Sequence, residues 1–178
     1  MELRPLEFLI VDILTFNVYN YIMEKIESIM FVCHGNICRS PTAEFVMKDI
    51  LAKRKITSVQ ISSAAVSSEE IFNGTGNPVY PPAKAVLLRH GIDCGNKRAV
   101  LLKKSDYDKY SLFAVMDSSN LKNAIDIFGG DPHNKIKKLG CFTNGKNISD
   151  PWYTRDFETA FKDIENNCIA LADIIAKQ

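Results

Sequence analysis

One short stretch of this chain constrains its fold more than any other. The residues Cys33-His34-Gly35-Asn36-Ile37-Cys38-Arg39-Ser40-Pro41 follow an apolar run at 28–32, which is typical of the end of a strand. After the loop, Ser40 is predicted to cap a helix and Pro41 to be its first residue. Glu44 then lies near the first turn, where the helix dipole favours an acid. We therefore predict a strand, a tight loop and a helix N-terminus.

This local geometry is suited to binding an anion. Backbone N–H groups of a tight loop can point inward, and the helix N-terminus adds positive potential. Gly35 lets the backbone turn where a Cβ would obstruct it. The guanidinium of Arg39 matches two oxygens of a phosphate group. The same field favours the thiolate of Cys33, which is then placed to attack phosphorus and form a covalent intermediate.

Other interpretations of the two loop cysteines are weighed against this one. A lone cysteine is more often a small buried hydrophobic residue, but the spacing of Cys33 to Arg39 favours a nucleophile. Cys38 either fills space or forms a disulfide with Cys33 under oxidation. The loop lacks the Gly-Lys-Ser/Thr of ATP-binding loops, and the sequence shows no obvious carboxylate cluster for a metal. We expect no metal and no cofactor.

Composition limits the class of protein and its surroundings. A chain of 178 residues is long enough for one domain with a substantial core. Its net charge of +1 does not favour a nucleic acid or a membrane surface as a partner. The five cysteines are odd in number and lack zinc-type spacing, which fits a reduced, cytoplasmic protein.

The apolar pattern predicts an α/β fold. A strand at 28–33, a helix at 41–54 and a strand at 58–62 form a right-handed βαβ unit, whose ligand lies beyond the carboxyl ends of the strands. The small polar residues 62–68 are predicted to be a loop. The remaining elements that we expect are a helix at 83–90, a strand at 112–116, a helix from Asp117, a weak strand at 136–139 and a helix at 157–176.

The loop resembles the signature of the low-molecular-weight protein tyrosine phosphatases. Their pattern is Cys, two residues of which the second is usually Gly, Asn, one residue, Cys, Arg and Ser. The resemblance runs from about Ile29 to the C-terminus. It implies a single-domain three-layer αβα sandwich with a four-stranded parallel sheet and a phosphate-binding loop after strand 1. It also implies hydrolysis of protein phosphotyrosine, or of an aryl phosphate, by a monomer or weak dimer.

A second motif supplies a candidate general acid. The leaving oxygen needs a proton, which a carboxyl group on a loop can donate. Asp150 precedes Pro151, and Asp-Pro alone is usually a turn, but the aromatic residues Trp152 and Tyr153 follow. The segment resembles the acid loop of the family. This implies that Asp150 protonates the leaving group and then activates water, and that both aromatic rings flank the substrate; core packing is the alternative for one of them.

The resemblance also implies which residues support and line the loop. Ser63 is expected to hydrogen-bond with Asn36 and Ser40, and Asn96 stands where many relatives carry a supporting histidine. Asp117 is expected to be structural. The catalytic set is Cys33, Arg39 and Asp150; the substrate-binding set is His34, Gly35, Asn36, Ile37, Cys38, Ser40, Trp152 and Tyr153; the supporting set is Ser63, Asn96 and Asn120.

Three alternative functions use a similar scaffold. Protein-arginine phosphatases usually carry Thr where this chain has Ile37. Thioredoxin-coupled arsenate reductases need two further cysteines close together, whereas Cys94, Cys141 and Cys168 are far apart in the sequence. A non-catalytic phosphate-binding module would keep Arg39 and lose the nucleophile or the acid. These features favour the tyrosine phosphatase.

Residues 1–22 lie outside the resemblance. They are too interrupted for a membrane span and make a poor signal peptide. One interpretation is an added element packed on the domain. The sharper hypothesis is a native start at Met23, with residues 1–22 a mis-assigned start or a cloning remnant and 23–178 the phosphatase domain.

Overall fold

The fold is built around strand β1 (Ser28–Cys33), in which all six residues are buried. The computed structural model describes residues 25–178. In the sheet, β1 lies between β2 (Gln60–Ala65) and β5 (Leu112–Val115), and β6 (Ile136–Lys138) follows β5. All three pairings are parallel. A strand covered on both faces must be apolar along its length, which explains the continuous apolar run of β1.

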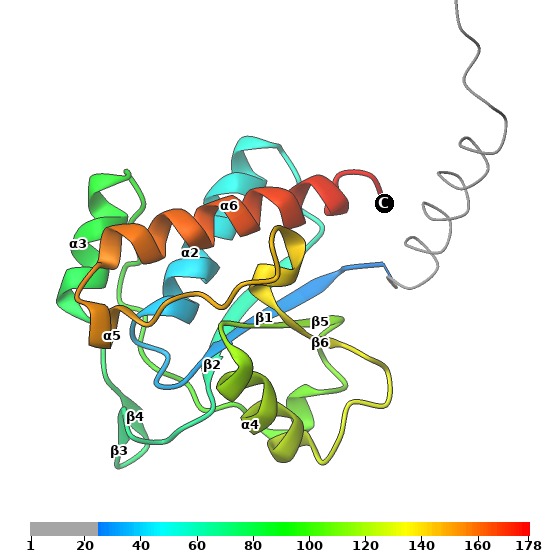
Figure 1. Cartoon of the computed structure of the whole chain (residues 1–178), viewed down its shortest axis with the longest axis horizontal. Helices are drawn as coiled ribbons and strands as arrows, with labels where there is room; N and C mark the ends of the chain where they lie inside the picture. Colours follow the sequence, from blue (N-terminus) through cyan, green and yellow to red (C-terminus); the bar gives the residue numbers. More distant parts are fainter. Residues whose placement is uncertain (1–24) are drawn as a thin grey trace, which may run out of the picture.

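Helices cover both faces of this sheet (Figure 1). Helices α2 (Arg39–Lys53), α3 (Pro81–Arg89) and α6 (Phe157–Ile175) lie on one face, and α4 (Ser118–Phe128) lies on the other. The predicted αβα sandwich with a four-stranded parallel sheet is therefore confirmed.

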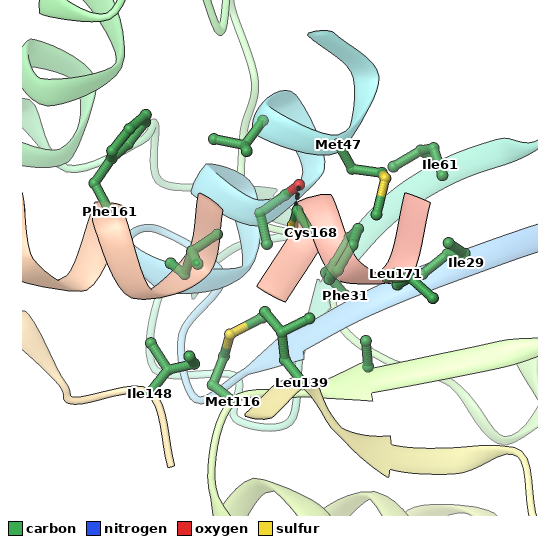
Figure 2. Close-up of a cluster of buried hydrophobic side chains, with 14 of the residues drawn as sticks. Ile29, Phe31, Met47, Ile61, Met116, Leu139, Ile148, Phe161, Cys168 and Leu171 are labelled. Carbon is green, nitrogen blue, oxygen red and sulfur yellow. Dashed lines mark hydrogen bonds between the residues drawn. The ribbon is translucent and has the colours of Figure 1, made fainter. Parts of the chain in front are cut away.

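The alternating side chains of β1 divide the core between the two faces. Ile29 and Phe31 belong to the cluster under α2 and α6, whereas Met30 and Val32 belong to the cluster against α4. Figure 2 shows the first cluster, in which Cys168 of α6 lies among apolar side chains and its thiol donates to the carbonyl oxygen of Ala43. Burial raises the pKa of the Cys168 thiol. Cys168 is thus a core residue, as its helical spacing predicts.

Short elements connect the main ones. The hairpin of β3 (Ile71–Phe72) and β4 (Thr75–Gly76) turns through Asn73 and Gly74, which both have positive φ, 49° and 78°. Such a pair of φ values is what a tight two-residue hairpin requires. The remaining short elements are the 3₁₀ turns η1 (Lys104–Asp106) and η2 (Leu139–Phe142) and the single-turn helix α5 (Pro151–Thr154).

One segment that we predicted to be a loop is a strand. Residues 62–65 complete β2, and Ser63 pairs with Phe31 in the register of the sheet. Small polar residues favour turns locally, but here pairing with β1 and burial of Ser63, Ala64 and Ala65 override that preference. The extra length brings Ser63 close to the loop that follows β1.

No helix within residues 25–178 is long and apolar enough to cross a membrane. The hypotheses about residues 1–22 and a start at Met23 concern a part of the chain that lies outside the described residues.

Candidate active site

The loop between β1 and α2 surrounds the sulfur of Cys33 with polar groups. Cys33 is the last residue of β1 and is 3% exposed. The backbone N–H of Asn36 donates to its Sγ at 3.3 Å, and Ser40 Oγ lies 3.0 Å from the same atom. The sulfur therefore lies where it can be stabilised as a thiolate.

Gly35 and Asn36 meet two different requirements of the loop: Gly35 leaves space for a neighbouring side chain, and Asn36 adopts the left-handed backbone conformation. A Cβ on Gly35 would lie 2.8 Å from Cγ of Glu70, so the residue is small because another side chain approaches it. The left-handed backbone falls instead on Asn36, with φ of 57°. Asparagine adopts this conformation more easily than most residues, and its completely buried side chain is held by hydrogen bonds.

The prediction that Ser40 caps the helix is wrong. Helix α2 already begins at Arg39, so Pro41 is its third residue rather than its first, and Cys38 stands at the N-cap without a side-chain hydrogen bond. The hydroxyl of Ser40 points into the loop, where Asn36 Nδ2 donates to it at 2.8 Å. The first N–H groups of α2 thus keep no side-chain cap and can serve a bound anion.

Arg39 lies buried between two carboxylates. Its Nη1 donates to Asp117 Oδ2 at 2.6 Å and to the carbonyl oxygen of Ile148 at 3.2 Å, and its Nη2 donates to Asp150 Oδ2 at 2.6 Å. Burial lowers the pKa of the guanidinium, but Cys33, Asp117 and Asp150 raise it more. Arg39 is therefore a charged group whose fork faces the pocket.

Each of these carboxylates also caps a helix. Asp150 Oδ1 accepts from the N–H of Trp152 at the start of α5, and Asp117 Oδ1 accepts from the N–H of Asn120 at the start of α4. Asp117 thus has the structural role that we expected. Its pairing with Arg39 is an additional feature that the sequence did not indicate.

These groups line one open cavity of about 360 Å³. This is a usual size for a small-molecule site. Its lining also includes Glu69, Glu70, Asp117 and Ser119. Most of the site residues predicted from the sequence line it too, namely Cys33, His34, Gly35, Ile37, Cys38, Arg39, Asn120, Asp150, Trp152 and Tyr153.

The two aromatic residues form an exposed wall of this cavity. Trp152 is 45% exposed and Tyr153 is 82% exposed, so neither packs in the core. The core-packing alternative is thus wrong for both. The ring of Trp152 lies 5.4 Å from that of Tyr80, between centroids, and the guanidinium of Arg155 lies 5.3 Å from its centroid. Tyr80, which we did not predict, supports Trp152 from behind.

Polar side chains from β2 and α2 hold the loop from behind. Asn36 Nδ2 donates to Ser40 Oγ and to Ser63 Oγ, each at 2.8 Å. Ser63 and Ser40 thus both bond to Asn36 rather than to each other. Ser63 Oγ in turn donates to Glu44 Oε2 at 2.5 Å.

Of the other two expected supporting residues, Asn96 lies away from the loop and Asn120 lines the pocket. Asn96 is exposed and makes no hydrogen bond to the loop, because the turn at Gly95 (φ 54°) directs it outward. Lys97 is turned inward in its place and donates to the carbonyl oxygen of Ser63 at 3.3 Å. Asn120 is 2% exposed and lines the pocket, and its Oδ1 has no hydrogen-bond partner among residues 25–178.

Glu44 is a site residue whose importance the sequence analysis missed. It lies beyond the first turn of α2, with its side chain 6% exposed, and pairs with Lys48 and Lys97. Burial raises the pKa of its carboxyl group, but the hydrogen bonds from Lys48, Ser63 and Lys97 lower the pKa by more. The pKa of Glu44 therefore lies below its usual value. A signal was present, because a carboxylate on the apolar face of a helix is seldom buried unless it is paired.

Cys38 is buried at the edge of the cavity as a neutral thiol. Burial, with the nearby charges of Cys33 and Asp150, raises the pKa of the Cys38 thiol to about 12. The disulfide between Cys33 and Cys38 under oxidation stays a prediction. Within residues 25–178, no group of three His, Cys, Asp or Glu side chains is arranged to hold a metal ion.

The fold and the site together define a class of protein. A buried cysteine at the carboxyl end of a parallel strand, an anion-binding loop and an adjoining arginine are the parts of a phosphatase with a cysteine nucleophile. The model of the family described as "Low molecular weight phosphotyrosine protein phosphatase" matches residues 28–178. The chain belongs to this family.

Individual relatives cover nearly the same part of the chain. Low molecular weight protein-tyrosine-phosphatase YfkJ of Bacillus subtilis is 30% identical over 155 residues, 85% of this chain and 97% of YfkJ. The low molecular weight phosphotyrosine protein phosphatase of Gallus gallus is 34% identical over 156 residues, 84% of this chain and 96% of that protein.

Solved structures show the same fold. The crystal structure of YfkJ aligns with a TM-score of 0.79 at 29% identity, covering 86% of this chain and 97% of YfkJ. Vibrio vulnificus Wzb in complex with benzylphosphonate aligns with a TM-score of 0.72 at 26% identity, covering 83% of this chain and 98% of Wzb.

Proposed function

We propose that this protein hydrolyses phosphotyrosine in proteins, without a metal ion, through a phosphocysteine intermediate. The observation that carries the proposal is that one cavity is lined by Cys33, Arg39 and Asp150. These are a nucleophile, a group that binds phosphate oxygens and a carboxyl group that can move a proton.

In the first step, the thiolate of Cys33 attacks phosphorus from the floor of the pocket. The S–P bond forms as the P–O bond to the tyrosine ring breaks. The phosphate oxygens take the place of Asp117 and Asp150 on the fork of Arg39, with which both carboxylates pair at 2.6 Å in the empty pocket. Asp150, released from Arg39, carries the proton that this step needs, which it takes from solvent. It gives this proton to the leaving oxygen.

In the second step, the same carboxylate acts as a base. Asp150 removes a proton from a water molecule, whose oxygen attacks the phosphorus of phosphocysteine. The P–S bond breaks, the thiolate of Cys33 returns and inorganic phosphate leaves. Arg39 and the backbone N–H groups of the loop stabilise the charge on the three equatorial oxygens in both steps.

The aromatic wall supports an aryl phosphate as the substrate. Trp152 and Tyr153 line the same cavity as the loop and are largely exposed, so their rings are free to contact the phenyl ring of a substrate. Wzb, a structural relative, was solved in complex with benzylphosphonate, a phosphonate that carries an aromatic ring.

The proposal extends to the surroundings of the enzyme. All five cysteines are free, which fits a reducing compartment such as the cytoplasm. Large exposed apolar side chains are few among residues 25–178, namely Phe72, Leu88, Val100, Trp152, Tyr153 and Ile169, which favours a monomer or weak dimer.

The decisive experiment measures phosphate release from a phosphotyrosine peptide in EDTA. We expect turnover by the wild type and a loss of roughly 10⁴-fold or more in Cys33→Ser, because the covalent step disappears. Cys141→Ser is the matched control, since Cys141 is exposed and lies outside the cavity. Retained activity in Cys33→Ser would reject the nucleophile.

Parallel substrates separate the alternative functions. Turnover of a phosphoarginine peptide alone would place the protein with the arginine phosphatases despite Ile37. Turnover of neither peptide, with phosphate binding retained, would favour a binding module. Reduction of arsenate with thioredoxin would reveal a reductase.

A further inference from the structure

Helix α4 contributes a buried polar side chain to the cavity that neither step of the proposed reaction uses. Asn120 lies in the first turn of α4, is 2% exposed and lines the cavity together with Cys33, Arg39 and Asp150. Within residues 25–178, its Oδ1 is the one buried side-chain nitrogen or oxygen atom without a hydrogen-bond partner. A buried acceptor without a donor weakens a fold, so stability does not explain this amide.

The backbone of Asn120, and not its side chain, holds the start of α4. Its N–H donates to Asp117 Oδ1 at 2.7 Å, while Asp117 Oδ2 accepts from Arg39 Nη1 at 2.6 Å. Any residue at this position except proline would supply the same N–H. The amide oxygen at the wall of the cavity is therefore available to a group that arrives with the reaction.

The chemistry of the two steps limits what that group can be. An amide oxygen accepts hydrogen bonds and donates none. The reacting end of the substrate is a phosphate, mainly a dianion at neutral pH, on an aromatic ring, and neither part then offers a polar hydrogen. The water molecule of the second step brings two hydrogens. Asp150 takes one of them, and the other needs an acceptor.

We propose that Asn120 is a catalytic residue of the second step, in which its Oδ1 and the carboxylate of Asp150 together hold the attacking water. One hydrogen of the water passes to Asp150, and the other stays on the oxygen and is donated to Asn120. A lone pair of that oxygen forms the new P–O bond as the P–S bond to Cys33 breaks. The thiolate returns, and phosphate leaves with the retained hydrogen.

This assignment deepens the proposed function and rests on it, because it names the residue that selects water as the acceptor. An alcohol has a single hydroxyl hydrogen, which would pass to Asp150, so its attack makes no use of Asn120. Loss of the amide should therefore slow the attack of water and leave the attack of methanol unchanged. A residue that only supported the fold or bound phosphate would affect both acceptors alike.

The test measures the products that form from nitrophenyl phosphate in the presence of methanol. Phosphorus NMR separates inorganic phosphate from methyl phosphate, and their ratio reports how water and methanol compete for the same phosphocysteine. The variants are Asn120→Leu, which removes the acceptor with little change of shape, and Asn120→Ala. Asn123→Leu is the matched control, since Asn123 is on the same helix but does not line the cavity.

We expect hydrolysis by Asn120→Leu to fall about 10- to 100-fold, because one contact instead of two orients the water. The ratio of methyl phosphate to inorganic phosphate should rise by the same factor. Without methanol, a burst of nitrophenol should precede the steady state, since phosphocysteine accumulates. The thermal midpoint should not fall, because the variant deletes an unpaired buried acceptor. Asn123→Leu should keep the wild-type ratio.

A wild-type product ratio in Asn120→Leu would overturn the inference, and the proposed function would stand as long as nitrophenol is released. An equal loss of both products together with lower thermal stability would also overturn it, as would the same shift in Asn123→Leu. If Asn120→Leu does not fold, Asn120→Ala removes the same acceptor and decides the question. A wild type that releases no nitrophenol would instead reject the proposed function itself.

Discussion

The two sides of the active-site pocket are held in different ways. The loop at 33–40 is buried over most of its length and lies between the core strand β1 and α2, with a hydrogen-bond chain behind it. The acid segment at 148–155 is mostly exposed, contains only the single turn of α5, and reaches the loop through the pair of Asp150 with Arg39.

This difference suggests that the two sides have different parts in the reaction. The loop is held by buried hydrogen bonds, among them those from Asn36 to Ser40 and to Ser63, and these bonds fix its shape around the sulfur of Cys33. The acid is held by the same guanidinium that the phosphate will occupy, so substrate binding itself releases it. Changes to the loop should therefore affect every substrate alike, whereas changes to the acid segment should depend on the leaving group.

Among variants that keep the nucleophile, the largest loss should follow Arg39→Lys. Lysine keeps the charge but lacks the planar fork, so it cannot contact two phosphate oxygens side by side. We expect kcat/KM to fall by about 10²- to 10³-fold for good and poor leaving groups alike, measured with a series of aryl phosphates. Arg155→Lys is the control, since this exposed arginine contacts Trp152 and not the loop. An unchanged rate would remove Arg39 from the phosphate site.

Asp150→Asn should slow mainly those substrates whose leaving oxygen must be protonated. The amide keeps the helix cap but cannot protonate the leaving oxygen, so we expect kcat to fall about 10²-fold with phenyl phosphate. A nitrophenyl ester, whose leaving group is a weak base, should lose much less. Equal losses for both esters would show that Asp150 is not the acid and would remove the contrast between the two sides.

Trp152→Ala should weaken substrate binding more than it slows the chemistry. The ring is partly exposed and its loss leaves the core intact, so the stability of the fold should change little. Loss of ring stacking, which is worth about 1 kcal/mol, should raise KM for phosphotyrosine roughly fivefold. Inorganic phosphate has no ring, so its inhibition constant should stay the same; a parallel change in that constant would place Trp152 in the phosphate site itself.

The smallest expected effect concerns the stability of the loop side in acid. The carboxyl group of Glu44 has a pKa lowered from 4.5 in the folded protein. A lowered pKa contributes stability above the unfolded value, and this contribution is lost as the pH falls through the folded value. The wild type should therefore be more stable than Glu44→Gln at neutral pH, and this difference in the free energy of unfolding should shrink below pH 4.5. Urea titrations of both proteins at several pH values measure it. Glu165→Gln, outside the pocket, is the control.

The linear order of residues was enough for much of the architecture. A continuous apolar run, the nine-residue motif at 33–41 and a helical apolar pattern follow one another along the chain, so β1, the loop and α2 could be located within two residues. Asp150 could be assigned to the same site through the resemblance of Asp150-Pro151-Trp152-Tyr153 to the acid loop of the family. In each case the signal lies in neighbouring residues, whose backbone preferences act before any tertiary contact forms.

The partners of the buried polar groups were decided only by the tertiary structure. Lys97 is turned toward Glu44, whereas its neighbour Asn96 is turned outward. The sequence does not show which of the two faces inward, since this depends on the path of the chain after the turn at Gly95. Likewise, Ser63 belongs to a strand only because β1 offers it a partner. These residues lie far apart in the chain, and a hydrogen bond between them depends on how β2, α2 and the segment 97–100 pack together. Local propensity carries no information about that packing.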